Sequence, residues 1–283
     1  MSKKFEKGKM VPVPSHAIIP ERDIDKSPIL ECSHLGIDFG GLRAVNDFNL
    51  TIGRTEIAGL IGPNGAGKTT IFNLLTKVYQ PTRGTILLDG LDTSGKTTAQ
   101  INRMGIARTF QNIRLFGAAS VLENLTIAME ADAHYTLADT LLRTPRFRRQ
   151  EEEFVERAKE LLAFFELDKK ADFMAKNLPY GEQRRLEIAR AMATHPKVLC
   201  LDEPAAGMNP SEVDDLVGMI QKIRQAHDVT ILLIEHHMSM VMAIADRIKV
   251  IEFGITIAEG KPDEIKNDPK VIEAYLGKEE EIC

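Results

Sequence analysis

The sequence predicts an α/β protein built around a parallel β-sheet, and three observations carry this prediction. Short apolar segments alternate with amphipathic segments over residues 182–251, a glycine-rich loop follows an apolar segment at Ile61, and two carboxylates follow another at Leu201. Parallel strands must be joined by crossover segments, and helices in those crossovers cover both faces of the sheet. With 283 residues, 43% of them hydrophobic, the chain is long enough for a sizeable core.

The first 27 residues differ from the rest of the chain. They contain several prolines and many charges without periodicity, so we expect residues 1–27 to form a disordered or extended tail. Gly40-Gly41 then divides two runs of alternating apolar residues, which predicts an antiparallel pair of strands. The elements expected up to residue 89 are strands over Leu30–Phe39, Arg43–Ile52, Glu56–Ile61 and Gly84–Asp89, with a helix over Thr69–Lys77.

The middle of the chain has helical periodicity. Within Glu151–Leu167 the apolar residues recur at intervals of three and four, which places them on one face of a helix: Phe154, Ala158, Leu161, Leu162 and Phe165. The segment Val121–Met129 also favours a helix. We therefore expect a helical subdomain, over about residues 115–195, inserted into the α/β core.

The alternation of helix and strand resumes after this insert. The expected order is a helix over Glu182–Thr194, a strand over Lys197–Leu201, a helix over Ser211–Gln225, a strand over Thr230–Ile234, a helix over His237–Ala245 and a strand over Ile248–Ile251. We expect a final helix before residue 277. The predicted organisation is one folded domain over residues 28–277, followed by a short tail over residues 278–283.

Charge and cysteine content exclude several classes of protein. The chain has 36 Lys and Arg against 41 Asp and Glu, a formal net charge of −5, so nucleic acid is not an expected partner. Three widely spaced cysteines favour reduced thiols and a cytoplasmic compartment. The longest apolar run, Met240–Ala245, is far too short to cross a bilayer, and the N-terminus lacks the apolar stretch of a secretory signal.

Residues 62–69 match the phosphate-binding loop pattern G-x-x-x-x-G-K-[ST], and they lie between a predicted strand and a predicted helix. Glycines let the backbone N–H groups turn inward around phosphate oxygens, Lys68 adds positive charge, and the hydroxyl of Thr69 suits Mg²⁺. The residues predicted to bind the nucleotide here are Gly62, Pro63, Asn64, Gly65, Ala66, Gly67, Lys68, Thr69 and Thr70.

The apolar strand ending at Leu201 is followed by Asp202 and Glu203. Ligands of open α/β sheets bind at the carboxyl ends of the strands, so both carboxylates are expected beside the phosphate loop. Asp202 can hold Mg²⁺ through water, and Glu203 can orient and polarise an attacking water. The sequence therefore predicts a nucleoside-triphosphate hydrolase.

The segment from Leu178 to Arg190 narrows the class. Leu-Pro-Tyr-Gly-Glu-Gln, followed by a predicted helix, resembles the L-S-G-G-Q signature of ABC-type ATPases, with Pro179, Tyr180 and Glu182 departing from the pattern. In that family the signature of one subunit closes over ATP held by the phosphate loop of another. The resemblance implies a P-loop NTPase fold with antiparallel and helical subdomains, and it places Tyr180, Gly181 and Glu182 at the nucleotide.

Other family elements follow in the expected order. Thr109-Phe110-Gln111 resembles the Q-loop, whose Gln contacts Mg²⁺ or the attacking water, and Ala206-Gly-Met-Asn209 resembles the D-loop, with Asn in place of Asp. His236, which follows a strand, resembles the switch histidine, and Phe39 matches the aromatic residue that stacks on adenine. The resemblance thus implies catalytic roles for Glu203, His236 and Gln111, and Mg²⁺ contacts from Thr69, Gln111 and Asp202.

Three stretches make the resemblance more specific. They are Arg108–Phe116, Leu178–Arg190 and Ala258–Gly277, and with the helical insert they look like the ATP-binding subunit of bacterial high-affinity branched-chain amino acid importers. This resemblance implies ATP and Mg²⁺ as cofactors and a peripheral location on the cytoplasmic face of the inner membrane. The implied partners are two permease subunits, a homologous ATPase subunit (in a heterodimer, or a homodimer in isolation) and, indirectly, an extracytoplasmic substrate-binding protein.

Other functions remain open at this point. Related ATPases drive urea or amide import and lipopolysaccharide export. A soluble ABC ATPase without a permease is a further alternative, although the chain has neither a sustained heptad pattern nor a second phosphate loop. A non-enzymatic nucleotide-binding regulator is disfavoured by Glu203. The basic cluster Arg143, Arg146, Arg148 and Arg149 either contacts lipid headgroups or the permease, or forms a solvated helix start, which the adjacent acidic run favours.

Overall fold

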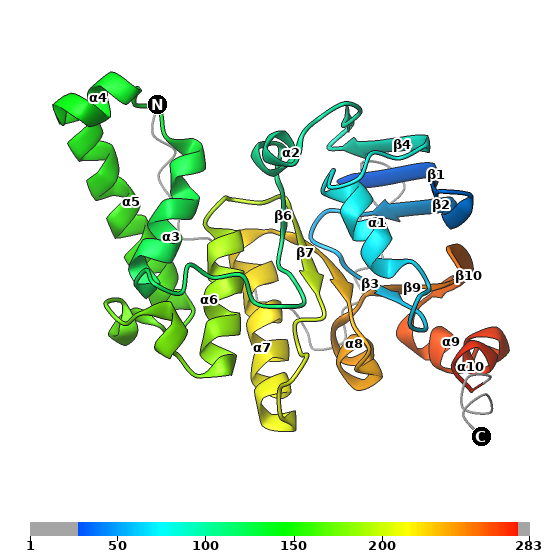
Figure 1. The fold of residues 1–283 in the computed structure, drawn as a ribbon. Helices are drawn as coiled ribbons and strands as arrows, with labels where there is room; N and C mark the ends of the chain where they lie inside the picture. Colours follow the sequence, from blue (N-terminus) through cyan, green and yellow to red (C-terminus); the bar gives the residue numbers. More distant parts are fainter. Residues whose placement is uncertain (1–27, 277–283) are drawn as a thin grey trace.

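Two β-sheets with helices between and around them make up the protein (Figure 1). The structure, a computed structural model, describes residues 28–276, so the tails expected over residues 1–27 and 278–283 lie outside the described residues. The smaller sheet has strand order β2-β1-β4-β5 and is antiparallel. Its strands are β1 (Leu30–Phe39), β2 (Leu42–Ile52), β4 (Arg83–Leu88) and β5 (Leu91–Asp92).

The larger sheet has six strands in the order β10-β9-β3-β8-β7-β6. Neighbouring strands run parallel except at the edge, where β10 pairs antiparallel with β9. The strands are β3 (Ile57–Ile61), β6 (Ile106–Arg108), β7 (Val198–Asp202), β8 (Thr230–Ile234), β9 (Arg247–Glu252) and β10 (Ile255–Gly260). The predicted parallel sheet and the antiparallel subdomain are both confirmed.

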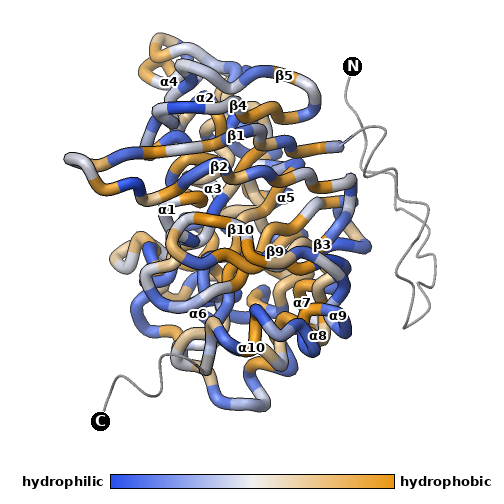
Figure 2. Tube along the Cα trace, turned by 90° about the vertical axis from the view of Figure 1, so that its right-hand side faces the viewer, coloured by the Kyte–Doolittle hydropathy of each residue, from blue (hydrophilic) through white to orange (hydrophobic). Residues whose placement is uncertain are grey.

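Alternate residues of the central strands belong to two different hydrophobic cores. In β8, Leu232 and Ile234 pack in the core shared with β1, β2 and helix α1 (Lys68–Leu75), whereas Ile231 and Leu233 pack in the core on the opposite side. This second core includes α6 (Tyr180–Met192), α7 (Pro210–His227) and α8 (Met238–Ile244). Both sheet faces are therefore covered, and the strands in the middle of the molecule carry mainly hydrophobic residues (Figure 2).

The helical insert contains α3 (Val121–Met129), α4 (Leu137–Leu142) and α5 (Pro145–Phe164), and α3 and α5 pack on each other and on α6 (Figure 1). The expected start of α5 at Glu151 was wrong by six residues. The hydroxyl of Thr144 accepts a hydrogen bond from the backbone N–H of Phe147, and Pro145 occupies the first helical position. Thr144 and Pro145 therefore set the start of the helix, which lies before the first residue of its apolar face.

Other predicted elements agree with the structure to within two residues at each end. Elements absent from the prediction are short: β5, β6, β10, α2 (Thr98–Met104), α4 and α9 (Pro262–Lys266). The expected final helix is α10 (Pro269–Leu276). None of the helices within residues 28–276 has both the length and the apolar character needed to span a membrane.

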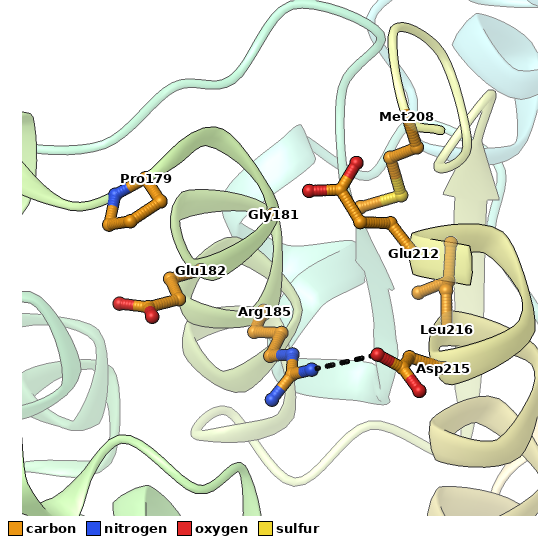
Figure 3. Close-up of a pocket in the computed structure, with 8 residues that line it drawn as sticks. All are labelled: Pro179, Gly181, Glu182, Arg185, Met208, Glu212, Asp215 and Leu216. Carbon is orange, nitrogen blue, oxygen red and sulfur yellow. Dashed lines mark ion pairs between the residues drawn. The ribbon is translucent and has the colours of Figure 1, made fainter. Parts of the chain in front are cut away.

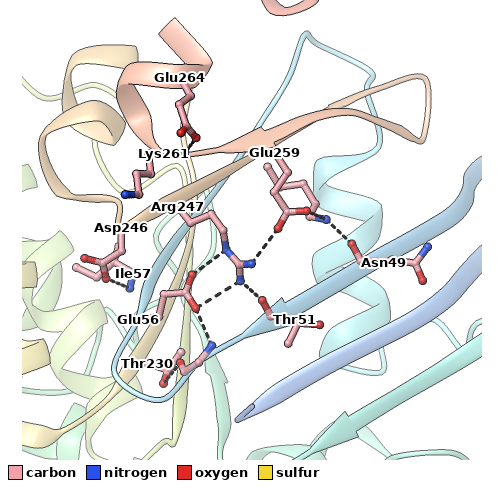
Figure 4. Close-up of polar contacts among 12 residues, drawn as sticks. Asn49, Thr51, Glu56, Ile57, Thr230, Asp246, Arg247, Glu259, Lys261 and Glu264 are labelled. Atoms are coloured by element: carbon pink, nitrogen blue, oxygen red, sulfur yellow. Dashed lines mark hydrogen bonds and ion pairs between the residues drawn. The ribbon is translucent and has the colours of Figure 1, made fainter. Parts of the chain in front are cut away.

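A polar network joins the two sheets at the first residues of β9 (Figure 4). Arg247 of β9 donates to the buried carboxylate of Glu56 at 3.0 Å and to the backbone carbonyl of Thr51 in β2. Lys249 donates to the carbonyl of Asn49 at 2.6 Å and pairs with Glu259 of β10 at 2.5 Å. These contacts tie β2 to the larger sheet, and β2 begins at the phosphate loop pocket.

Candidate functional site

The phosphate loop connects β3 to α1, as its sequence predicts, and close packing requires two of its glycines, Gly62 and Gly67. A Cβ on Gly62 would lie 2.0 Å from the carbonyl oxygen of Ile251, and one on Gly67 would lie 2.9 Å from that of Ala44. Gly67 is also the N-cap of α1 with φ of 100°, a conformation that L side chains rarely adopt. The loop therefore brings backbone N–H groups and a helix N-terminus to one point, where an anion is favoured.

Lys68 is held inside this loop. Its ammonium donates to the carbonyl oxygens of Gly62 at 2.6 Å and Pro63 at 2.9 Å, and the residue is only 6% exposed. The loop thus positions the charge beside the N–H groups before any nucleotide binds. A positive charge fixed in this way suits the β- and γ-phosphates of a nucleotide.

A pocket of about 350 Å³ lies over the loop and brings distant residues together. It is lined by loop residues Asn64 to Thr70, by Glu203 and His236, and by Leu42, Arg43, Ala44 and Phe253. The last four were not predicted from the sequence. Phe253 lies in the tight turn between β9 and β10, where the sequence shows only an aromatic residue before a glycine.

Phe39, the predicted adenine-stacking residue, lies at the β1–β2 turn opposite Leu42. It is 40% exposed and makes an edge-to-face contact with Tyr79, with ring centroids 5.2 Å apart. Its partial exposure argues against a core role, and its partner Leu42 lines the pocket. Phe39 and Phe253 are therefore the two aromatic candidates for the base of a nucleotide.

Glu203, His236 and Gln111 form a hydrogen-bonded cluster. One carboxylate oxygen of Glu203 lies 2.6 Å from Nε2 of His236, and the other accepts from Nε2 of Gln111 at 2.6 Å. The backbone N–H of Glu203 donates to the carbonyl of Ile234 at 2.9 Å, which fixes it in a left-handed conformation with φ of 48°. By contrast, His237 lies beside Glu235 at 3.1 Å, so the geometry supports His236 as the switch residue.

Asp202 is buried and paired with an arginine. Its carboxylate accepts from Arg108 at 2.5 Å, and Arg108 also donates to Asn73 of α1 at 2.7 Å. The guanidinium lies within 5.4 Å of the ring centroids of Phe72 and Phe110. The sequence did not single out Arg108 as a partner of Asp202, because residues 94 positions apart give no local signal.

The donor set around the loop suits magnesium bound together with phosphate. Thr69, Gln111 and Asp202 offer hydroxyl, amide and carboxylate oxygens, which Mg²⁺ prefers. Across residues 28–276, no group of three or more His, Cys, Asp or Glu side chains forms a metal-binding cluster. In nucleotide-binding proteins Mg²⁺ is usually held by one or two protein side chains, and phosphate oxygens and water complete its coordination. A phosphate loop with few carboxylates beside it fits this pattern.

The signature segment starts α6, and its residues contact neighbouring loops. The hydroxyl of Tyr180 donates to the carbonyl of Ala206 at 2.8 Å, which joins the signature to the predicted D-loop. Glu182 pairs with Lys170 at 2.6 Å. A Cβ on Gly181 would come within 3.2 Å of Glu212, so the backbone here is closely approached by α7.

A separate pocket of about 250 Å³ lies between α6 and α7 (Figure 3). It is lined by Pro179, Gly181, Glu182, Arg185, Met208, Glu212, Asp215 and Leu216. Figure 3 shows Arg185 pointing from α6 towards Asp215 of α7, 3.7 Å away. Among the described residues, those lining the phosphate loop pocket do not include Tyr180, Gly181 or Glu182. One chain thus presents the loop and the signature as two separate surfaces.

A buried ion pair connects α6 to the Q-loop, and the sequence analysis did not predict it. Arg184, fully buried, pairs with Glu187 at 2.7 Å and donates to the carbonyls of Phe110 and Gln111, each at 2.8 Å. Burial raises the pKa of Glu187, an effect that Arg184 opposes. The helix that carries the signature therefore also holds the backbone of Gln111 in place. Two charged residues on the buried side of a predicted helix were the only signal.

Two segments of the chain match models of known protein families. Residues 45–206 match the family model for ABC transporters, and residues 256–281 match that for branched-chain amino acid ATP-binding cassette transporters. The chain is 51% identical over 250 residues to the high-affinity branched-chain amino acid transport ATP-binding proteins BraF of Pseudomonas aeruginosa and LivG of Escherichia coli K12. Each alignment covers 88% of this chain and 98% of the relative.

Solved structures of ATP-binding cassettes have the same fold. The ADP conformation of one cassette of an ABC transporter superposes with a TM-score of 0.77 at 31% identity, covering 88% of this chain and 99% of that chain. A nucleotide-free cassette gives a TM-score of 0.77 at 32% identity, covering 88% and 98%. The predicted α/β P-loop fold is thereby confirmed.

Proposed function

Because the chain belongs to the ABC transporter family as an ATP-binding protein, we propose that it hydrolyses ATP to drive the import of branched-chain amino acids. The observation that carries hydrolysis is Glu203, held between Gln111 and His236 in the wall of the phosphate loop pocket. The cargo is supported by the relatives at 51% identity and by the match over residues 256–281. No observation favours urea, amide or lipopolysaccharide as cargo.

Residues 62–70 bind the polyphosphate. Backbone N–H groups and the N-terminus of α1 face the phosphate oxygens, and Lys68 exchanges its two carbonyl partners for the β- and γ-phosphates. Phe39 stacks on the base. Thr69, Gln111 and Asp202 would hold Mg²⁺, which would neutralise phosphate charge when bound.

Glu203 acts on the attacking water. Its carboxylate accepts a hydrogen bond from the water and orients it towards the γ-phosphate, in the manner of a general base. His236 and Gln111 keep this carboxylate in one orientation, since each contacts a different oxygen of it. Lys68 stabilises the negative charge of the transition state.

A second ATPase subunit completes the site. Tyr180, Gly181 and Glu182 lie on a different surface from the phosphate loop, so the signature contacts nucleotide held by another subunit. The carboxylate of Glu182 is paired with Lys170. The donors to the γ-phosphate are therefore the backbone N–H groups at the start of α6. ATP then drives closure because it binds the closed pair better than the open pair.

The remaining partners follow from this role. The chain works as a heterodimer with a homologous ATPase subunit, or as a homodimer in isolation, against two permease subunits at the cytoplasmic face of the inner membrane. An extracytoplasmic binding protein supplies the cargo. Residues 28–277 form the ATPase domain, and the helical subdomain over about residues 115–195 contacts the permease.

The test is transport by the reconstituted complex in proteoliposomes. Leucine uptake should require ATP, and it should be lost when the subunit carries Glu203→Gln. Lipopolysaccharide or urea offered to the same vesicles should leave ATP turnover at its basal rate. ATP-dependent uptake of urea without uptake of leucine would overturn the assignment of cargo, and full turnover with Glu203→Gln would overturn the assignment of Glu203.

A further inference from the structure

A third pocket lies at the amino ends of the strands of the larger sheet, whereas the phosphate loop lies at their carboxyl ends. It has a volume of about 380 Å³ and sits where α5 meets the carboxyl ends of α6 and α7. Pro196 and Asp228, just before β7 and β8, line it, whereas Asp202 ends β7 and Glu203 follows it at the other end of the strand. The volume falls in the range of small-molecule sites.

The walls of this pocket combine an apolar surface with charges of both signs. Leu161, Phe164 and Met192 supply the apolar part. Arg157 supplies a positive charge to the wall of the pocket, and Glu160 and Asp228 supply negative charges. The carboxyl ends of α6 and α7 add partial negative charge, which favours a cation beside them.

His227 provides an unexplained polar atom here. Its Nε2 is buried and has no hydrogen-bond partner within the described part of the chain, while its ring packs edge-to-face on Phe164 with centroids 5.0 Å apart. A buried polar atom without a partner costs free energy unless a ligand or water satisfies it. Because the atom is buried, a polar group of a ligand reaches it when the His227 ring turns toward the pocket that the residue lines.

Arg157 and His195 form the second polar feature. The guanidinium of Arg157 contacts the imidazole of His195, and burial together with Arg157 lowers the pKa of that histidine. Burial likewise lowers the pKa of His227. Within residues 28–276 no carboxylate pairs with Arg157, so its guanidinium can receive the carboxylate of a ligand, whose geometry it matches.

We propose that this pocket binds a small zwitterion with an apolar body, namely a free apolar amino acid from the cytoplasm. The carboxylate contacts Arg157, the ammonium lies at the carboxyl end of α7 beside His227 and Asp228, and the side chain packs on Leu161, Phe164 and Met192. The choice of leucine as the specific ligand rests on the proposed function. A bound ligand braces α5 against α6, whose other end carries Tyr180 of the signature.

Titration of the full-length isolated chain with leucine, followed by calorimetry, tests the site. We expect saturable binding, with 4-methylpentanoate, which lacks the ammonium, and 3-methylbutylamine, which lacks the carboxylate, each at least about tenfold weaker. Arg157→Met and His227→Phe should each weaken leucine binding at least about tenfold. Arg149→Met, the same change at an exposed position of α5, should leave it unchanged.

ADP binding to each variant reports whether the phosphate loop and the fold are intact. The proposal is overturned if leucine does not bind the wild-type chain, if the two analogues bind as well as leucine, or if folded Arg157→Met and His227→Phe retain wild-type affinity. The comparison of analogues uses the wild-type chain only, so it does not depend on how a variant folds. Because no partner subunit is present, failure here leaves the transport assignment standing, and failure of transport leaves the binding result standing.

Discussion

Arg108 and Asp202 form a buried ion pair of 2.5 Å next to Glu203, which lines the phosphate loop pocket, and each side chain is less than a tenth exposed. The pair joins β6 to β7, and Asn73 and two aromatic rings hold the guanidinium from the other side. The carboxylate proposed to serve Mg²⁺ is therefore already paired with the residue that directly precedes the Q-loop. Removing one member of such a pair leaves a buried charge without its partner.

Arg108→Met should accordingly destabilise the chain by on the order of 3–5 kcal/mol, measured by urea unfolding in the absence of nucleotide. Arg114→Met is the matched control, because Arg114 is exposed and packs on the same ring of Phe110. The double variant Arg108→Met/Asp202→Asn should recover part of the loss, since the unpaired carboxylate is gone. Equal stabilities for Arg108→Met and Arg114→Met would contradict the pair's role.

Glu203→Gln should abolish ATP hydrolysis while ATP affinity stays near that of the wild type. The amide keeps the size of the side chain and can still contact His236 and Gln111, but it cannot accept a proton from water. A loss of about 10²–10⁴-fold in turnover is expected for removal of a general base. Turnover is measured with the partner subunit present, and trapping of the closed dimer by gel filtration is the second readout.

Lys68→Ala is the contrasting change, because it should remove nucleotide binding itself. A Glu203→Gln protein that had lost ATP affinity to the same degree would place Glu203 in binding rather than in chemistry.

Phe39→Ala should weaken ATP affinity without changing the fold, since stacking on a base contributes about 1–3 kcal/mol. Phe253→Ala is its matched comparison: Phe253 lines the phosphate loop pocket and is 71% exposed, whereas Phe39 contacts Tyr79. Titration of both variants with ATP and with inorganic triphosphate separates base from phosphate contacts. A loss confined to Phe253→Ala would transfer the stacking role to that residue.

Asp89 should make the stability of the chain depend on pH in acid. Hydrogen bonds from Lys197, at 2.5 Å, and from Arg54 lower the pKa of Asp89 in the folded state. A carboxyl whose pKa is lower when folded contributes stability above its unfolded pKa, and that contribution is lost as the pH falls through the folded value. Asp89→Asn should therefore cost at most about 1 kcal/mol at neutral pH and progressively less as the pH falls through the folded pKa of Asp89, by urea unfolding at neutral and at lower pH. A cost that persists at the lower pH would show that packing, not charge, is responsible.

Local signals explain why much of the fold was predictable. The apolar strands β3, β7 and β8 are buried along their whole length, and each ends at a motif, so pattern and chemistry agreed on their limits. The start of α5 was missed because its first turn is polar and only Thr144 and Pro145 mark it. Short elements such as β6 and α4 carry too few residues for periodicity to indicate them.

The residues of the candidate site likewise fall into two groups, those with a local signal in the sequence and those without one. The cluster of Glu203, His236 and Gln111 was predictable because each residue belongs to a motif with its own local context. Partners such as Arg108 for Asp202, and Arg184 for the Q-loop, depend on contacts between segments more than 70 residues apart. Their side chains are charged yet buried, which no local pattern distinguishes from solvated charges.

Arg184 links α6 to the Q-loop without lining the phosphate loop pocket. Arg184→Met would leave Glu187 and the carbonyls of Phe110 and Gln111 without their buried donor, and a loss of about 3–5 kcal/mol in stability is expected. Arg184→Lys keeps the charge but cannot donate to both carbonyls and the carboxylate from a planar fork. We expect Arg184→Lys to fold, to bind ATP with unchanged affinity and to hydrolyse it more slowly, because Gln111 loses its fixed backbone. A purely structural role predicts instead that turnover per folded molecule stays at the wild-type value, so turnover and affinity must be measured on the same preparation.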